Sequence, residues 1–596
     1  MAHARTRLAL GVLLLASGCG GLGSAERIER HGVIVSEHPL ATRVGVDVLA
    51  AGGNAADAAV ATALALAVVY PQAGNLGGGG FAVCAQAKGD ATTYDFREVA
   101  PAGFRPELYL DENGDFVAER SLSTALAVGV PGTPAGLWRL LEDQGSGRFT
   151  FSQLAAPAIR LAEDGFRVDP FMARDLEGSA RKRLEKDPAA SAVFLPGGNA
   201  LAEGAVLKQP ELAQTLRALS RGPSGFYSGS VAQAMVDALI EVDRREGFVA
   251  AGGSLSMQDL ADYEVIERSP LVGWFRGHEV IGMAPPSSGG LVLLQSLALL
   301  EGFPLDTERT ADGEPTARAL HWWIECMRRS FADRAVHMGD PAFHDVPLDE
   351  LLAPEWIARR RVEIGELADP AVAAWASAPA PESNQTTHLS VLDDKGNAVS
   401  LTTTLNASFG SGILVPGAGF LLNNEIDDFA IQAGTPNLYG LVGSEANALV
   451  AGKRPLSSMS PTIVRDNGRV LIVIGAPGGP RIITSVMQVL LRIMVYGQDL
   501  ETAVRAPRLH QQWKPTLTRF EGGWDPEQLD ALQTVHGHET LLQERGRYGS
   551  VQIIVADRAG RANGFSDPRR GGVAGRVGDP LPAPAHPSAP VRPVER

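Results

Sequence analysis

Cysteine is scarce in this chain of 596 residues, which contains only three. Cys19 lies close to the N-terminus, whereas Cys84 and Cys326 stand in apolar stretches that favour a strand and a helix. Two cysteines in the body of so long a chain exclude the disulfide scaffold of small secreted proteins. We expect both to be buried free thiols, although the sequence alone leaves open whether they pair.

Metal-ligand motifs and basic surfaces are also missing. No CxxC or HExxH pattern occurs, so the sequence predicts neither a bound metal nor another cofactor. The formal net charge is −15, and the basic pairs Lys453-Arg454 and Arg569-Arg570 are isolated rather than part of a basic stripe. A chain of this kind is a poor candidate for nucleic-acid binding.

Long hydrophobic runs are absent as well, and no segment is expected to span a membrane. The first 25 residues are typical of an export signal, with basic residues before a short apolar run at 8–16. Small residues before Cys19 resemble a bacterial lipoprotein cleavage site, although Ala16 stands where leucine is usual. The alternative is an ordinary secretory signal. Either way, we expect the protein to be exported, to the periplasm, to a lipid anchor at Cys19, or out of the cell.

Glycine, by contrast, is abundant, with 67 residues, and many glycines stand in short clusters. Such clusters indicate turns and close backbone approaches. The cluster at 77–80 lacks the lysine and hydroxyl residue of a phosphate-binding loop, so we predict tight backbone packing there.

The pattern of apolar residues changes character along the chain. Between about 39 and 337 it favours helices, with one hairpin; beyond 386 strands become frequent. Helices are predicted within 39–69 (two, the second capped by Asn54) and at 133–143, 152–163, 230–245, 315–337 and 483–497, and strands at 81–87, 91–96, 388–392, 398–405, 462–465, 470–474 and 551–555. The segment 370–384 is rich in alanine, proline and serine, which predicts an exposed stretch open to cleavage.

Thr386 follows that stretch directly, at the start of a predicted strand. A threonine in a strand is by itself ordinary. If the hairpin turn is centred on 395–396, however, Thr386 lies opposite Thr404 or Leu405. Two hydroxyl groups then come within reach of each other, with Asn406 just beyond them.

A hydroxyl nucleophile needs a base, and cleavage before Thr386 would supply one. A free α-amino group has a pKa of roughly 7.7–8.0, so part of it is unprotonated at neutral pH. We therefore predict that the Thr386 hydroxyl attacks the carbonyl of Gln385, and that water hydrolyses the resulting ester. Thr404 would orient the Thr386 hydroxyl through a hydrogen bond.

The residues around Thr386 resemble the processing site of the gamma-glutamyltransferases. Further similar motifs follow one another in family order over nearly the whole chain, at 75–81, 95–98, 332–334, 339–341, 385–388, 397–399, 404–410, 421–429, 453–461 and 475–479. Several are long and chemically unusual, so the resemblance is specific.

The resemblance implies a fold and a division of the chain. The expected fold is α/β, the four-layer αββα sandwich of N-terminal-nucleophile hydrolases. Autoprocessing is expected to divide the precursor into a large subunit, 26–385, and a small catalytic subunit, 386–578, which stay associated as a heterodimer. A tail at 579–596 is rich in proline and expected to be loose. The expected reaction passes a gamma-glutamyl group, as from glutathione, through an ester on Thr386 to water, an amino acid or a peptide.

The donor's carboxylate is expected to be bound by a fork of hydrogen bonds. Arg97 can form two parallel bonds to a carboxylate, and Ser457 and Ser458 can donate two more. Without the resemblance, Arg97 would be interpreted as a surface arginine and the serines as turn residues after Pro455.

The donor's ammonium needs groups that only accept hydrogen bonds. Glu425 and Asp428, with the side-chain oxygen of Asn406, can provide them, and some family members carry glutamine at the position of Glu425. The alternative is a solvated acidic turn.

Three further features complete the predicted site. The backbone N–H groups of Gly478 and Gly479 are expected to stabilise the oxyanion, although Pro-Gly-Gly is by itself an ordinary turn. The stretch 430–440 resembles the substrate-covering loop of some family members, with Tyr439 as its gate; it could equally be a surface loop with a packed tyrosine. His388 shares a face with Thr386 but is predicted to be structural, because the α-amino group makes a second base unnecessary.

Two alternatives to a gamma-glutamyl hydrolase and transpeptidase remain. A related acylase would act on glutaryl or cephalosporin-type amides, which have no ammonium to bind, so the intact Glu425, Asp428 and Asn406 argue against it. A non-catalytic surface protein would not need Thr386 and Thr404.

Overall fold

The computed structural model describes residues 31–246, 255–369, 386–432 and 434–580. The predicted export signal with Cys19, the segment 370–385 with Gln385, and the tail beyond 580 lie outside the described residues. No helix among the described residues is long and apolar enough to cross a membrane.

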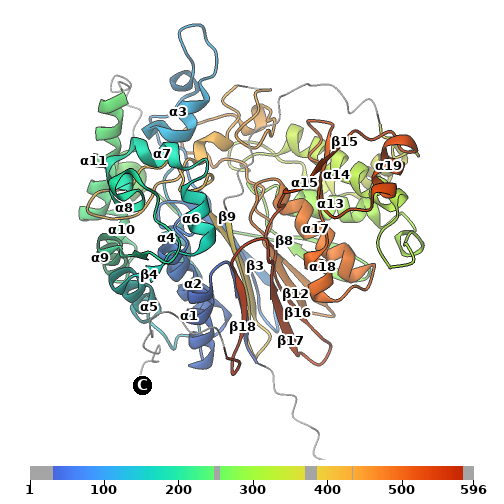
Figure 1. Cartoon of the computed structure of the whole chain (residues 1–596), viewed down its shortest axis with the longest axis horizontal. Coiled ribbons are helices and arrows are strands. Elements are labelled where there is room, and N and C mark those ends of the chain that lie inside the picture. Colours follow the sequence, from blue (N-terminus) through green and yellow to red (C-terminus); the bar gives the residue numbers. More distant parts are fainter. Residues whose placement is uncertain (1–30, 247–254, 370–385, 433, 581–596) are drawn as a thin grey trace, which may run out of the picture.

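Two sheets lie face to face at the centre of the molecule (Figure 1). The first has seven strands in the order β18 (Val573–Arg576), β1 (Val33–Ser36), β9 (Thr386–Leu392), β10 (Ala398–Thr404), β2 (Gly79–Ala85), β3 (Ala91–Phe96) and β6 (Ile266–Arg268). The second has six, in the order β17 (Ala562–Ser566), β16 (Gln552–Ala556), β12 (Arg469–Gly475), β11 (Thr462–Asp466), β8 (His278–Gly282) and β7 (Leu271–Phe275). Every pairing within both sheets is antiparallel.

Helices cover the outer face of each sheet. On the side of the seven-stranded sheet lie α1 (Pro39–Ala50), α2 (Ala55–Val69), α4 (Thr133–Gln144), α5 (Phe151–Asp164), α9 (Pro210–Leu219) and α11 (Gly229–Glu246); on the other side lie α13 (Gly289–Leu300), α14 (Ala317–His337) and α17 (Arg481–Met494) (Figure 1). One hydrophobic core joins the first group of helices to their sheet, and a second lies between the sheets and under α13, α14 and α17. The predicted αββα sandwich is therefore confirmed.

The local predictions agree with these elements to within a few residues. Asn54 caps α2 with a reciprocal capping box, in which its side chain accepts from the backbone N–H of Asp57. Cys84 in β2 and Cys326 in α14 are both buried and free, as expected. The short strands β1 and β18 were not predicted, because a strand of only four residues gives little period to detect.

The glycine cluster at 77–80 packs against backbone on both sides, which confirms the predicted close approach. A Cβ atom on Gly78 would lie 2.0 Å from the carbonyl oxygen of Thr404, and one on Gly80 would lie 2.3 Å from that of Thr402. Only glycine leaves room for β2 to lie this close to the end of β10. The glycine cluster thus fixes the position of Thr404 from the side of the neighbouring strand β2.

Candidate active site

Thr386 and Thr404 are direct cross-strand partners in the hairpin of β9 and β10. This is the first of the two registers that the turn predicts. Both side chains are buried, each with 3% exposure, although they stand at the end of the sheet. The Thr404 hydroxyl accepts a hydrogen bond of 2.9 Å from the backbone N–H of Asn406, which fixes its position. The hairpin therefore places two hydroxyl groups side by side.

Arg97 leaves the end of β3 and is buried, with only 1% exposure, which excludes a surface arginine. Its Nη1 donates to Glu425, and its Nη2 donates to Asp428 Oδ2 at 2.6 Å. Its Nε donates to the carbonyl of Pro455 at 3.2 Å. The guanidinium thus joins the loop before β11 to the acidic turn at 425–428, and that turn is buried rather than solvated.

Burial raises the pKa values of the carboxyl groups around Arg97, because the nearby arginines offset only part of the cost of burying a negative charge. Burial raises the pKa of Glu98 to about 7 and that of Glu425 well above its usual value, while Arg97 opposes both shifts. The pKa of Asp428 is also raised by burial, against the attraction of Arg97 and Arg334. Three carboxyl groups thus face two arginines, and the cluster has acceptor capacity left for a cationic ligand.

Donors for an anion stand close to the same cluster. The hydroxyl of Ser458 is buried and has no hydrogen-bond partner among residues that the structure describes. The hydroxyl of Ser457 accepts from the backbone N–H of Met459 at 3.2 Å, which leaves its own proton free to donate. The Ser457 and Ser458 hydroxyls can therefore both donate to an anion that enters beside Arg97.

Gly478 and Gly479 connect β12 to the start of α17. Their φ angles are +131° and +56°, a conformation in which glycine is strongly favoured. Across the described ranges, neither N–H donates to an acceptor in the protein. Both groups are therefore available to stabilise a negative charge near the N-terminus of a helix of 14 residues.

The predicted covering loop lies over this site. The Tyr439 hydroxyl donates to the carbonyl of Asn406 at 2.7 Å, and the Tyr439 ring lies 2.7 Å from where a Cβ on Gly479 would stand. Asn437 donates to Asp428 at 2.9 Å, so the loop is also tied to the acidic turn. The space left beneath is only about 20 Å³, which is room for roughly one water.

One small cavity brings together ten of the predicted residues. Its lining includes Arg97, Thr386, Thr404, Asn406, Glu425, Asp428, Tyr439, Ser457, Ser458 and Gly479. Gly478 adjoins the cavity without lining it. The side-chain nitrogen of Asn406 donates to the carbonyl of Asn424 at 2.8 Å, so its side-chain oxygen is left as the acceptor of this amide.

Three charged residues near the cavity had no predicted role. Glu98 and Arg334 stand inside two of the motifs, 95–98 and 332–334, that resemble the gamma-glutamyltransferases. Those motifs were the signal in the sequence that could have identified both residues. Arg570 donates to the backbone carbonyl of Thr386 at 3.0 Å and to the Tyr70 hydroxyl at 2.9 Å. It stands in a pair that the sequence shows only as isolated.

The contacts of His388 agree with the structural role that the sequence predicts, because its ring bonds to hydroxyl groups of β9 and β10. Its ring nitrogens lie 2.8 Å from the Thr402 hydroxyl and 3.1 Å from the Ser390 hydroxyl, between the two sheets. Complete burial lowers its pKa to about 3. A neutral ring bonded on both sides holds the hairpin against the second sheet, and it does not change its protonation state near neutral pH.

This environment predicts a pH-dependent effect of the His388→Asn substitution. The unfolded chain binds a proton near pH 6.5, whereas the folded chain resists protonation of His388 down to about pH 3. The stabilising contribution of the histidine is therefore fully present above pH 6.5, and it is lost progressively as the pH falls from 6.5 toward 3. We expect the advantage of the wild type over the variant to shrink by about 2 kcal/mol between pH 7 and pH 5.

Thermal melting of both proteins at pH 7 and pH 5 measures this effect. The expected result is that the gap between their Tm values narrows at pH 5. His344→Asn, at a partly exposed position beyond α14, serves as the control, and its gap should stay constant. A gap for His388→Asn that widens at pH 5 would contradict the neutral, buried state.

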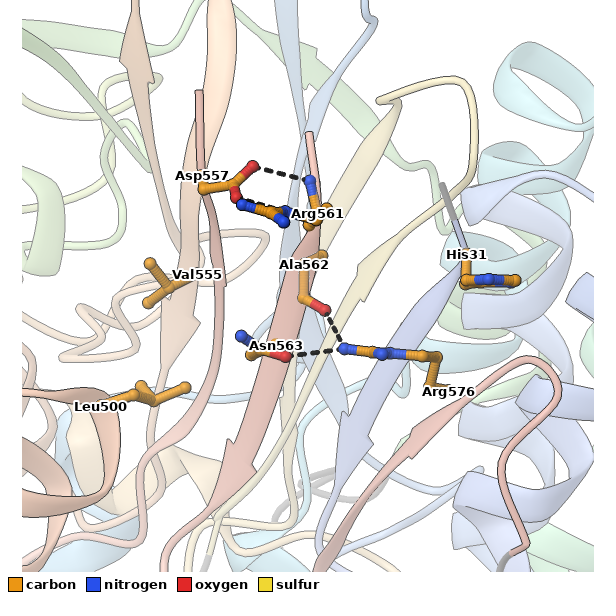
Figure 2. A pocket seen from close by; sticks show the side chains of 8 residues that line it. All are labelled: His31, Leu500, Val555, Asp557, Arg561, Ala562, Asn563 and Arg576. Atoms are coloured by element: carbon orange, nitrogen blue, oxygen red, sulfur yellow. Dashed lines mark hydrogen bonds and ion pairs between the residues drawn. The ribbon is translucent and has the colours of Figure 1, made fainter. Parts of the chain in front are cut away.

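A larger cavity, of about 630 Å³, shares no lining residue with this site (Figure 2). It opens beside β17 and β18, and its charged groups are already paired. Arg561 donates to Asp557 at 2.7 Å, and Arg576 donates to Asn563 at 2.7 Å. Figure 2 shows no converging set of donors or acceptors, so size alone does not identify the functional site.

Comparison with known proteins agrees with the geometry. The family model for gamma-glutamyltranspeptidase matches residues 41–577. The glutathione hydrolase proenzyme of Escherichia coli (strain K12) is 41% identical over 544 residues, which cover 91% of this chain and 90% of that protein. The glutathione hydrolase proenzyme of Pseudomonas sp. (strain A14) is 43% identical over 551 residues, covering 91% and 93%.

Acylases are related too. The acylase ACY 1 proenzyme of Pseudomonas sp. (strain SE83) is 35% identical over 485 residues, covering 80% of this chain and 82% of that protein. Among solved structures, cephalosporin acylase from Bacillus halodurans superposes with a TM-score of 0.78 at 27% identity, over 94% of this chain and 99% of that one. In both its sequence and its αββα architecture, the chain therefore belongs to the gamma-glutamyltranspeptidase family, whose fold is that of the N-terminal-nucleophile hydrolases.

Proposed function

We propose that this enzyme cleaves the gamma-glutamyl amide of glutathione and related compounds through an ester on Thr386. The glutamyl group then passes to water or to an amino acid or peptide. The observation that carries the proposal is the single cavity in which the hydroxyl of Thr386 meets Arg97, the unpartnered hydroxyl of Ser458 and the acidic turn at 425–428. These groups match the carboxylate and ammonium at the head of a gamma-glutamyl donor.

Maturation comes first and uses the same hydroxyl. The Thr386 oxygen attacks the carbonyl carbon of Gln385, the peptide bond to the Thr386 nitrogen breaks, and an ester forms in its place. Water hydrolyses that ester to a carboxylate on Gln385 and regenerates the Thr386 hydroxyl. The freed α-amino group, with a pKa of roughly 7.7–8.0, becomes the base for later turnovers. The result is a large and a small subunit held together by the two shared hydrophobic cores.

Acylation by the donor follows the same course. The α-amino group takes the proton of the Thr386 hydroxyl as its oxygen attacks the gamma-carbonyl of the donor. The N–H groups of Gly478 and Gly479 stabilise the oxyanion, and one such donor typically contributes about 2.7–4 kcal/mol. The α-ammonium then protonates the departing amine, and the glutamyl ester remains. Water or an acceptor amine reverses these steps to release glutamate or a new gamma-glutamyl amide.

Recognition of the donor depends on opposite charges held close together. Arg97 and Ser458 are placed to bind the α-carboxylate, while Glu425 and Asp428 face the ammonium. Without a ligand, the guanidinium and the two carboxylates bond to one another. A zwitterionic head can enter between them without leaving any charge unpaired, which an uncharged or purely anionic acyl group cannot do.

A pair of chromogenic substrates tests this proposal against acylase activity. The gamma-glutamyl anilide and the glutaryl anilide differ only in the ammonium group. We expect the wild type to prefer the gamma-glutamyl compound in kcat/KM by about 100-fold, the effect of about 3 kcal/mol from charge-assisted hydrogen bonds. Equal rates, or faster release from the glutaryl compound, would identify an acylase instead.

A further inference from the structure

The strand that begins with the nucleophile has a gap on one side. β9 pairs with β10 along its whole length, whereas its pairing with β1 begins at Leu389. β1 ends at Ser36, and the chain then turns away into α1, which begins at Pro39. In the described part of the chain, no strand therefore lies beside positions 386–388 on the side of β1. The backbone of the nucleophile needs another partner on that side.

Arg570 reaches across this gap, and the register of the sheet explains why. Val573 in β18 lies opposite Ser36, which lies opposite Leu389 in β9. Arg570 precedes Val573 by three positions, and Thr386 precedes Leu389 by three, so the same count brings Arg570 into line with Thr386. The Arg570 Nη1 donates to the Thr386 carbonyl at 3.0 Å. A side chain thus makes the hydrogen bond for which β1 is too short.

The position of Arg570 is fixed by a second contact, at the end of α2. The same Nη1 donates to the Tyr70 hydroxyl at 2.9 Å. Tyr70 is buried, with 2% exposure, and its backbone N–H donates to the carbonyl of Leu66 in α2. Glu37, the first residue beyond β1, is buried as well; burial raises its pKa to about 7, and attraction to Arg570 opposes this rise. The guanidinium therefore joins the nucleophile to a hydroxyl that the helical core holds in place.

Cleavage before Thr386 increases the need for this contact. The first residue of a chain is poorly ordered unless other contacts hold it. In the mature enzyme the peptide bond to Gln385 is gone, and the hydroxyl and α-amino group of Thr386 must both face one substrate carbonyl. Both groups share a Cα atom with the carbonyl that Arg570 binds, so a fixed carbonyl restricts their rotation. Small displacements of reacting groups are costly in rate.

We propose that Arg570 is a positioning residue for the nucleophile, and that its bond to the Thr386 carbonyl holds the new N-terminus in its reactive orientation. This inference rests on the proposed function, because it concerns the same hydroxyl and α-amino group. Arg570 is not part of the lining of the small cavity that receives the donor. Its loss therefore lowers kcat and leaves KM nearly unchanged, whereas the loss of Arg97 raises KM.

The Arg570→Gln substitution tests this inference through kcat and KM for the gamma-glutamyl anilide. We expect kcat per cut chain to fall by about 20-fold, the size of one charge-assisted hydrogen bond, with KM within about twofold of the wild type. The cut itself is expected to be slower in freshly made protein, since maturation uses the same hydroxyl. Arg570→Lys keeps the charge and a donor, and should restore part of kcat. A denaturing gel gives the cut fraction, and Tm values show whether each variant is folded.

Tyr70→Phe is a second, milder variant, because it keeps the ring in the core and removes only the hydroxyl that holds Arg570. We expect kcat to fall by about threefold with an unchanged KM, the size of one modest hydrogen bond. Arg576→Gln is the matched control. Arg576 lies in β18 and also donates to a backbone carbonyl, that of Ala562 at 2.8 Å, but away from β9 (Figure 2). Its loss should leave kcat at the wild-type value.

A wild-type kcat in Arg570→Gln, a loss confined to KM, or an equal loss in Arg576→Gln would overturn the inference. If Arg570→Gln gives no folded and cut protein, Tyr70→Phe decides: a lower kcat with an unchanged KM supports the inference, and a wild-type kcat overturns it. Release of the anilide by the wild type separates the two proposals. If the wild type releases it and the variants match the wild type, the function stands and the inference fails; if the wild type releases none, both fail.

Discussion

The Thr386→Ala protein is expected to remain a single uncut chain and to release gamma-glutamyl anilide at least about 1,000-fold more slowly than the wild type. The substitution removes the atom that attacks the Gln385 carbonyl, so no new α-amino group forms. It also removes the atom that carries the glutamyl ester. The effect is large because one hydroxyl performs both steps. A denaturing gel and the rate of anilide release measure the two consequences separately.

Thr387→Ala is a closely matched control for this experiment. It removes the same kind of hydroxyl one residue further along β9, where alternation places it on the opposite face of the strand. The Thr387 hydroxyl is buried without a hydrogen-bond partner among the described residues, so its loss breaks no bond seen there. We expect normal cleavage and nearly normal turnover. An uncut Thr387→Ala protein, or a cut Thr386→Ala protein, would contradict the assignment of the nucleophile.

The Arg97→Lys protein is expected to mature normally but to lose about 100-fold in kcat/KM for the gamma-glutamyl anilide, mostly through a higher KM. Lysine keeps the positive charge among the buried acids, which protects the fold. It cannot reproduce a fork that reaches Glu425 through one nitrogen and Asp428 through another. Losing about two charge-assisted hydrogen bonds, at about 1.5 kcal/mol each, corresponds to that factor.

Steady-state kinetics and a denaturing gel check this prediction together. Arg139→Lys serves as the control, because Arg139 forms an exposed ion pair with Asp143 and should tolerate the change. A protein with Arg97→Lys and an unchanged KM would show that Arg97 only holds the acidic turn in place. Arg97→Leu is expected to be more damaging still, since it leaves buried carboxylates without their partner at a typical cost of about 3–5 kcal/mol.

The fold by itself does not separate a gamma-glutamyl enzyme from an acylase. Proteins of both names are similar to this chain, and the cephalosporin acylase structure has the same overall arrangement. What distinguishes the two activities is the charge of the donor head. Burial raises the pKa values of Glu425 and of the half-buried Asp428, which makes both carboxylates costly for the fold, and the proposed ammonium of the donor would offset that cost.

Features that depend on neighbours in the chain were predictable from the sequence. The position of one tight turn limits the cross-strand partner of Thr386 to Thr404 or Leu405, because antiparallel strands count outward from their turn, and the structure has the first of these pairings. The close packing of Gly77–Gly80, the helix cap at Asn54 and the buried thiols follow from local composition in the same way. The resemblance to one family supplied the rest of the predicted site, residue by residue.

Contacts between distant segments were decided only by the tertiary structure. Arg97 meets Glu425 across 328 positions of the chain, and Arg570 meets Thr386 across 184. No periodicity encodes such pairs, since they arise when the two sheets and the loops at their ends are packed together. Sequence alone predicted the nucleophile, indicated the family and limited the cross-strand partner of Thr386 to two residues. The choice of Thr404 and the balance of buried charge around it came from the fold, because burial is a property of the whole chain.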